Sequence, residues 1–179
     1  MEGIVVAHTE KSYFDPVEIA KELDTDNVQK ANKIAQIAHI VFDKIANEIR
    51  KYITAGNKVY YLADDSKSPD SDSIYPAIRA QSSNMTFIPM DGNFEKQCLR
   101  AKEHVIADNV DKVVVSGVAY DCCVSDMYHL LLGEEGPNSK INDYQHASNG
   151  LGWSIEKFKK IFNTKLNAVI RSDLTNKLV

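Results

Sequence analysis

DKVVVSGVAYDCCVSDMYHLLLG, residues 111–133, contains the clearest structural pattern in the sequence. The β-favouring run 113–116 leads into Gly117, and apolar residues at helical spacing follow from Cys123 to Leu131. This pattern predicts a buried strand, a tight turn and a helix. In such a junction the first backbone N–H groups of the helix point at one spot, where the helix dipole favours negative charge.

Cys123 has the position of a candidate nucleophile in this junction. A helix N-terminus lowers a thiol pKa from about 8.5 toward neutrality and so raises the fraction of reactive thiolate. Free cysteine is also among the most buried residue types, and packing is the competing explanation. Position alone therefore leaves two interpretations open, a nucleophile and a core residue.

The run 113–124 resembles the nucleophile segment of the isochorismatase-like cysteine hydrolases, a family that includes the nicotinamidases. In that family an apolar strand is followed by G-[VI]-A-T-D-x-C-V. The residues that match are Gly117, Val118, Ala119, Asp121, Cys123 and Val124, whereas Tyr120 stands where threonine is usual. The resemblance implies that Cys123 is the catalytic nucleophile. It also implies an oxyanion hole formed by backbone N–H groups around Ala119, Tyr120 and Cys123.

The first predicted strand, residues 3–7, ends in polar residues. Its uninterrupted apolar run is typical of a parallel strand covered on both faces, and open α/β sheets bind ligands at the carboxyl ends of such strands. His8 and Glu10 are therefore candidate functional residues. Members of the resembled family usually begin with a strand of the type LLVIDxQNDF. Aligned on this strand and on Phe14, the chain has His8 at the position of the catalytic aspartate and Glu10 where glutamine is common.

The family's catalytic lysine is also missing from its usual place after the third strand, where this chain has Pro89, Met90 and Asp91. Two of the three catalytic positions therefore depart from the family, and only the cysteine is retained. Imidazole, with a pKa near 6.5, is a competent general base for a thiol, so we expect His8 or, as a fallback carboxylate, Glu10 to move the proton. A strand-end histidine that bonds to neighbouring backbone is the structural alternative for His8.

The rest of the chain predicts alternating helices and strands. The predicted elements are a short helix at 17–23, a long amphipathic helix at 28–53 with Thr25 or Asp26 as N-cap, strands at 58–63 and 85–90, a helix at 94–107 with Cys98 buried, an edge strand at 141–144, a helix from Ser154, a strand at 166–170 and a closing helix. We expect one domain, residues 1–179, with a three-layer α/β/α fold and a mainly parallel, Rossmann-like sheet. The resemblance implies the isochorismatase-like form of that fold.

The loop at 64–73, DDSKSPDSDS, is rich in aspartate. Carboxylates suit a hard cation such as Mg²⁺ or Ca²⁺, but the spacing lacks the central glycine and terminal glutamate of an EF-hand. Some members of the resembled family bind a divalent metal in this loop through D-x-H and a second histidine. Asp65 matches that aspartate, whereas Lys67 and Ser71 stand at the two histidines. We therefore expect no metal and no other cofactor of the family type, and the sequence leaves cation binding by the loop open.

Composition excludes several classes of protein. The net charge is -4 and no run of lysine and arginine occurs, which argues against nucleic-acid binding. No stretch approaches the roughly 18 apolar residues that a membrane-spanning helix needs. Three cysteines, two of them adjacent, make a poor disulfide framework, so we expect a reducing, cytoplasmic environment. Relatives in the resembled family commonly form dimers or tetramers, which implies a homo-oligomer.

These residues support a first hypothesis, a cysteine hydrolase that cleaves a C–N amide or related bond of a small planar or cyclic molecule. Phe14, Ala119 and Tyr120 are expected to bind the substrate, and the Tyr120 ring is suited to stack on a planar ligand. The second hypothesis is a catalytically inactive relative that binds a small molecule or a partner protein, because the aspartate and the lysine are missing. A purely structural subunit is the third.

Overall fold

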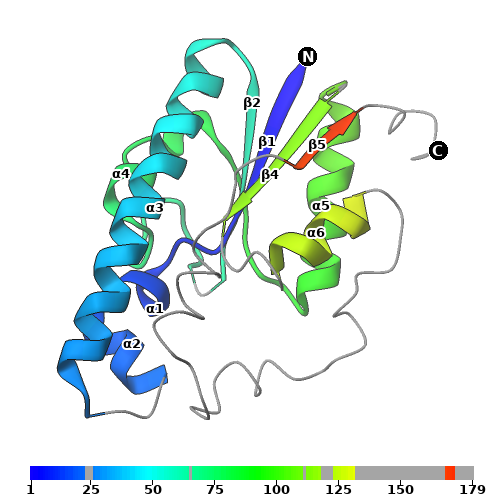
Figure 1. The fold of residues 1–179 in the computed structure, drawn as a ribbon. Coiled ribbons are helices and arrows are strands. Elements are labelled where there is room, and N and C mark those ends of the chain that lie inside the picture. The colour runs from blue at the N-terminus through cyan, green and yellow to red at the C-terminus, as the bar shows by residue number, and fades with distance from the viewer. Residues whose placement is uncertain (23–25, 65, 111, 118–122, 132–167, 172–179) are drawn as a thin grey trace.

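The computed structural model describes residues 1–22, 26–64, 66–110, 112–117, 123–131 and 168–171, and in them it has an α/β, Rossmann-like fold (Figure 1). The strands are β1 (Glu2–Ala7), β2 (Lys58–Leu62), β3 (Thr86–Ile88), β4 (Lys112–Gly117) and β5 (Ala168–Arg171). They form one sheet in the order β3-β2-β1-β4-β5. The first four are parallel to their neighbours, and β5 runs antiparallel to β4, which confirms the predicted, mainly parallel sheet.

Helices cover both faces of the sheet. They are α1 (Lys11–Phe14), α2 (Pro16–Glu22), α3 (Val28–Thr54), α4 (Pro76–Arg79), the 3₁₀ helix η1 (Ser82–Asn84), α5 (Phe94–Ala107) and α6 (Ser125–Leu131). In Figure 1, α3 lies on one side of the strands and α5 and α6 lie on the other. The three expected layers are therefore present in the part of the chain that the structure describes.

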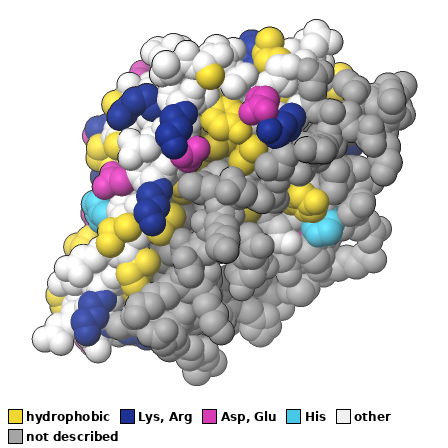
Figure 2. All heavy atoms as spheres, turned by 45° about the horizontal axis from the view of Figure 1, so that its top comes forward, with side chains coloured by type: hydrophobic (Ala, Val, Ile, Leu, Met, Phe, Trp, Pro, Cys, Tyr) yellow, Lys and Arg dark blue, Asp and Glu magenta, His cyan; other side chains and the backbone are white. Residues whose placement is uncertain are grey.

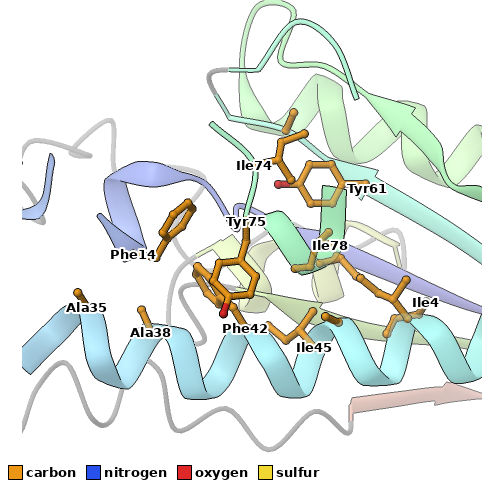
Figure 3. Packing of buried hydrophobic residues seen from close by; sticks show 14 of the residues in the cluster. Ile4, Phe14, Ala35, Ala38, Phe42, Ile45, Tyr61, Ile74, Tyr75 and Ile78 are labelled. Carbon is orange, nitrogen blue, oxygen red and sulfur yellow. The ribbon is translucent and has the colours of Figure 1, made fainter. Parts of the chain in front are cut away.

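The two faces of β1 show how the sequence divides the core. Ile4 and Val6 pack with the buried stripe of α3, whereas Val5 and Ala7 pack with α5 and α6. Successive side chains of a strand point to opposite faces, so a strand buried on both faces has to be apolar throughout. Figure 3 shows the α3 side of the core, where Phe42 lies among residues from several elements.

Helix α3 is stabilised at both ends by local hydrogen bonds. The Asn27 side chain caps the N-terminus by accepting a hydrogen bond of 3.0 Å from the backbone N–H of Lys30. The prediction of Thr25 or Asp26 as N-cap is therefore wrong by one or two positions. At the other end Gly56 has a φ of 73°, and its N–H donates to the Ile53 carbonyl. Glycine adopts this left-handed conformation without the steric cost that a Cβ brings.

Most predicted elements have their counterparts in the structure. The helix predicted at 94–107 is confirmed to the residue, and the strands predicted at 3–7 and 58–63 differ from β1 and β2 by one residue. The strand predicted at 85–90 is shorter, at Thr86–Ile88, and ends before Pro89, which has no N–H to donate to a strand ladder. The predictions for 141–144, for the helix from Ser154 and for the closing helix lie outside the described residues.

Candidate functional site

The order of the strands defines one place in the sheet where a site is expected. Strand β1 lies between β2 and β4, and the chain passes from β1 to β2 through α3 on one face and from β3 to β4 through α5 on the other. Ligands of open α/β sheets bind at the carboxyl ends of the strands, where this change of direction opens a crevice. The carboxyl ends of β1 and β4 are Ala7 and Gly117, which are paired in register.

His8 follows directly after β1 and has an unusual backbone conformation. Its φ is 54°, in the left-handed region that only a few per cent of non-glycine residues adopt. Regular alternation along β1 would turn the side chain toward α3. Instead the imidazole ring lies against Phe94, the first residue of α5, with ring centroids 5.1 Å apart. The left-handed turn therefore brings the fully buried imidazole to the α5 face of the sheet.

Cys123 belongs to the same face. It lies two residues before α6, is 2% exposed and packs in the apolar cluster that includes Ala7 and Phe94. Cys123 and Val124 form a π-helical turn that continues directly into α6 at Ser125, so Cys123 lies at the N-terminal end of the described helical segment. The structure thus assigns His8 and Cys123 to one face of the sheet, after the carboxyl ends of two adjacent strands.

Gly117 allows β4 to approach β1 closely at this point. Its φ is 125°, and a Cβ built on it would lie 2.1 Å from the Ala7 carbonyl oxygen. Any other residue would push the two strand ends apart, because the clash is with backbone. The fold therefore requires the glycine of the sequence motif at this position.

Glu10 holds the loop after β2. Its side chain is buried, and its two carboxylate oxygens accept hydrogen bonds from the backbone N–H groups of Asp64, at 2.7 Å, and Ser66, at 3.2 Å. Glu10 also forms an isolated antiparallel bridge with Ile74. These contacts give the carboxylate a positioning role in the segment between β2 and α4.

Phe14 lies on the other side of the sheet from His8. It is 7% exposed and packs in the core beside α3, with edge-to-face ring contacts to His39, Phe42 and Tyr75 (Figure 3). The structure therefore does not bring this predicted substrate-binding residue together with His8 and Cys123. The predicted contributions of Ala119 and Tyr120, including the oxyanion hole, lie outside the described residues.

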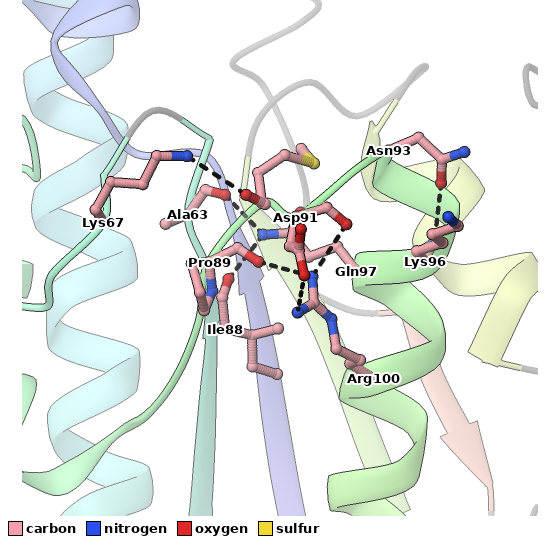
Figure 4. Close-up of polar contacts among 10 residues, drawn as sticks. Ala63, Lys67, Ile88, Pro89, Asp91, Asn93, Lys96, Gln97 and Arg100 are labelled. Carbon is pink, nitrogen blue, oxygen red and sulfur yellow. Dashed lines mark hydrogen bonds and ion pairs between the residues drawn. The ribbon is translucent and has the colours of Figure 1, made fainter.

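Gln97 is a further polar residue of this region, and it belongs to none of the sequence motifs described above. It is fully buried in α5, and its side-chain Nε2 donates to the carbonyl oxygens of Ala63, at 2.6 Å, and Ile88, at 2.7 Å (Figure 4). These carbonyls follow β2 and end β3, so Gln97 ties α5 to the carboxyl edge of the sheet. One signal was available in the sequence: a glutamine on the apolar face of a helix, three residues after Phe94.

A lysine does reach the segment after β3, although it comes from another part of the chain. The Lys67 ammonium lies 3.5 Å from the Met90 carbonyl oxygen, in the region where the resemblance predicts a catalytic lysine (Figure 4). Lys67 is exposed and belongs to the aspartate-rich loop. Sequence order alone does not reveal such a contact between two loops.

Cys98, the second described cysteine, is a buried core residue, as predicted. It is 1% exposed on the inner face of α5. Burial raises the pKa of its thiol well above the ordinary value, and the nearby carboxylates of Asp126 and Glu95 add to this effect. Cys98 is therefore an uncharged thiol at neutral pH.

The described residues also bear on metal and membrane binding. Among them, no group of three or more His, Cys, Asp and Glu side chains is close enough to hold a metal ion. No described helix is long and apolar enough to cross a bilayer. On the face drawn in Figure 2, the described lysines and arginines are interspersed with acidic and apolar side chains and form no continuous basic stripe.

Comparisons with protein-family models, with curated proteins and with solved structures find no significant match for this chain. The functional argument therefore depends on the residues and their arrangement.

Proposed function

We propose that this protein is a cysteine-dependent hydrolase of the isochorismatase-like, nicotinamidase-like type, which cleaves an amide or related bond of a small molecule. The observation that carries the proposal is the left-handed backbone of His8, which turns the imidazole to the face of the sheet that holds Cys123. Backbone strain of this kind is concentrated at functional sites. The site lies at the switch point of the sheet, where α/β folds bind ligands.

In the proposed reaction, His8 takes the proton of the Cys123 thiol and the thiolate attacks the carbonyl carbon. The tetrahedral intermediate collapses, the C–N bond breaks, and the leaving amine takes the proton from the imidazolium. A water molecule, deprotonated by His8, then attacks the thioester. This step releases the carboxylic acid and restores the thiol of Cys123.

The contacts of Glu10 favour His8 as the group that moves the proton. Both carboxylate oxygens of Glu10 already accept backbone N–H groups. These contacts hold the Glu10 carboxylate against the loop after β2, whereas the imidazole of His8 lies on the face of the sheet that holds Cys123. We therefore assign Glu10 to positioning the loop after β2.

The oxyanion hole is assigned to backbone N–H groups around Ala119, Tyr120 and Cys123, on the basis of the sequence motif. One such donor typically contributes ~10²- to 10³-fold in rate. Slow catalysis is therefore expected even though the usual aspartate and lysine are absent. Phe14 is not retained as a substrate contact, because it packs in the core beside α3.

One observation favours the alternative of a binding module without catalysis. His8 is 0% and Cys123 is 2% exposed, so neither side chain is open to solvent in this structure. A thiolate in apolar surroundings is disfavoured by desolvation. A protein that keeps the fold and binds a small molecule or a partner protein without catalysis would tolerate this burial.

Ammonia release from a panel of small aromatic and cyclic amides tests the proposal. We expect slow turnover by the wild-type protein, loss of turnover in Cys123→Ser, and retention in the control Cys98→Ala, because Cys98 is a buried core residue to which the proposed reaction assigns no role. Intact-mass measurement should detect an acyl group on the wild-type and Cys98→Ala proteins and none on Cys123→Ser. Binding of panel members without turnover or an acyl group would instead support the binding module.

A further inference from the structure

The buried amide of Gln97 has a fixed orientation. Its Nε2 donates to two carbonyl oxygens, of Ala63 and Ile88, and a carbonyl accepts hydrogen bonds only, so the nitrogen has to face these two groups (Figure 4). The other end of the amide, Oε1, is therefore also fixed. This oxygen is buried and accepts no hydrogen bond from any residue of the described part of the chain.

A buried acceptor without a donor is unusual in a folded protein. At least about 90% of buried polar groups have a hydrogen-bond partner, and each exception requires an explanation. The fully buried Gln97 side chain is held by two short hydrogen bonds, at 2.6 and 2.7 Å, so it has no freedom to turn its oxygen toward another donor. A hydrogen-bond donor on a bound ligand would satisfy Gln97 Oε1 and so explain this exception.

The register of the sheet locates this amide beside the site described above. Ala7 is paired with Leu62, so the next residues along the two strands are His8 and Ala63, and the Ala63 carbonyl is bonded to Gln97. Phe94, one helical turn before Gln97 on the buried face of α5, packs against His8. The Gln97 amide is thus at the carboxyl edge of the sheet, on the face that holds His8 and Cys123.

We propose that Gln97 is a specificity-determining residue whose Oε1 accepts a hydrogen bond from an N–H group of the bound small molecule. The site would therefore select ligands with an N–H donor, such as a carboxamide, over analogues of the same shape that lack it. This inference rests on the proposed function for the location of the site, but it does not require catalysis. The competing occupant is a buried water molecule.

Binding to Cys123→Ser protein tests this inference without turnover. The probes are two pairs of matched shape, benzamide with acetophenone and cyclohexanecarboxamide with cyclohexyl methyl ketone. Because an unsatisfied buried acceptor costs roughly a factor of ten to a hundred in affinity, each amide should bind about that much more tightly than its ketone. The ¹⁵N–¹H side-chain resonances of Gln97, assigned by their loss in Gln97→Met, should shift with the amides.

In Gln97→Met the preference for the amide should disappear, since methionine has a similar length and no acceptor of comparable strength. The matched control is Gln81→Met. Gln81 is 9% exposed, its Oε1 is also buried without a donor among the described residues, and its Nε2 donates to the carbonyls of Ala46 and Ala77 beside α3, on the other side of the sheet from His8. This variant should keep the preference. If Gln97→Met fails to fold, the affinities of the two ligand pairs for the Cys123→Ser protein decide alone.

Equal affinities within both pairs, unshifted Gln97 resonances, or no binding of any probe would overturn the inference. So would a bound water beside the Gln97 amide that persists at saturating amide, seen by water–protein cross-relaxation. An amide preference in a protein without turnover would uphold the Gln97 subsite and reject the hydrolase. Turnover without an amide preference would uphold the hydrolase and reject the Gln97 subsite.

Discussion

Gly117 brings the ends of the two central strands closer together than any other residue type would allow. Its φ of 125° and the short distance to the Ala7 backbone both require the absence of a Cβ. The neighbouring His8 is held in a left-handed conformation at the same edge. Two exceptional backbone conformations therefore occur at paired strand ends, and the proposed chemistry is located there.

Gly117→Ala should destabilise the protein by at least ~3 kcal/mol, because the new Cβ meets backbone atoms and the backbone conformation disfavours a side chain. Urea unfolding followed by circular dichroism measures the loss. Gly56→Ala is the matched control: its φ is 73°, but nothing lies within 4 Å of the added Cβ. That variant should lose only about 1 kcal/mol. Equal losses in the two variants would contradict the close approach of β4 to β1.

The sequence identified His8 and Cys123 as candidates but did not predict how they are oriented. Strand alternation gives the wrong face for His8, since a positive φ in a histidine is imposed by the surrounding fold and leaves no local pattern. Phe14 was selected by alignment with a family motif. An aromatic residue serves equally well in a core, and the ring packs with Phe42 and Tyr75.

At the scale of elements, Glu10 links the loop after β1 to the loop after β2. The two backbone N–H groups that it binds belong to Asp64 and Ser66, and the Tyr75 N–H donates to Thr9 a little farther along. Together these bonds hold the start and the end of the aspartate-rich loop against the carboxyl edge of the sheet. Both ends of the loop are therefore fixed to the segment that follows β1.

Glu10→Gln should speed the hydrogen exchange of the Asp64 and Ser66 amides and destabilise the protein by about 1–3 kcal/mol, because one acceptor becomes an N–H donor facing another donor. Exchange measured by NMR and urea unfolding check the two effects. The control is Glu48→Gln, which alters a surface pair with Lys51 and should change stability by less than ~1 kcal/mol. Unchanged exchange at both amides would remove the positioning role of Glu10.

Periodic elements were the most predictable from the sequence. Helix α5 and strand β2 have strong apolar patterns and appear almost as predicted. The short helices α1 and α4 have four residues each, too few to show a helical period, and they were not predicted. The N-cap of α3 was misplaced because three adjacent residues, Thr25, Asp26 and Asn27, all suit that position by residue type.

For the whole molecule, the strand order carries the functional argument. With β1 between β2 and β4, and with helices on both faces, residues far apart in the sequence meet at one edge of the sheet. His8, Gln97 and Cys123 come from three different segments and share the α5 face. The sequence predicted the layers and the mainly parallel sheet. The role of Gln97 follows only from its hydrogen bonds to the carbonyls at the ends of two strands, which the sequence does not reveal.

The central claim is that Cys123 is an activated thiol with His8 as its partner, and the pH dependence of iodoacetamide labelling tests it most directly. Peptide mass spectrometry separates the cysteines, and Cys98 serves as an internal reference because its raised pKa keeps the thiol neutral and slow to react. His8→Asn is the best variant, since asparagine tolerates the left-handed backbone of position 8 while removing the imidazole.

We predict that Cys123 is labelled rapidly near pH 6 in the wild-type protein, much faster than Cys98. In His8→Asn the labelling of Cys123 should move toward the pH of an ordinary thiol, about 8.5. Labelling of Cys123 that rises only near pH 8.5 in the wild type, or that requires unfolding as for a core residue, would contradict the account and favour the binding module.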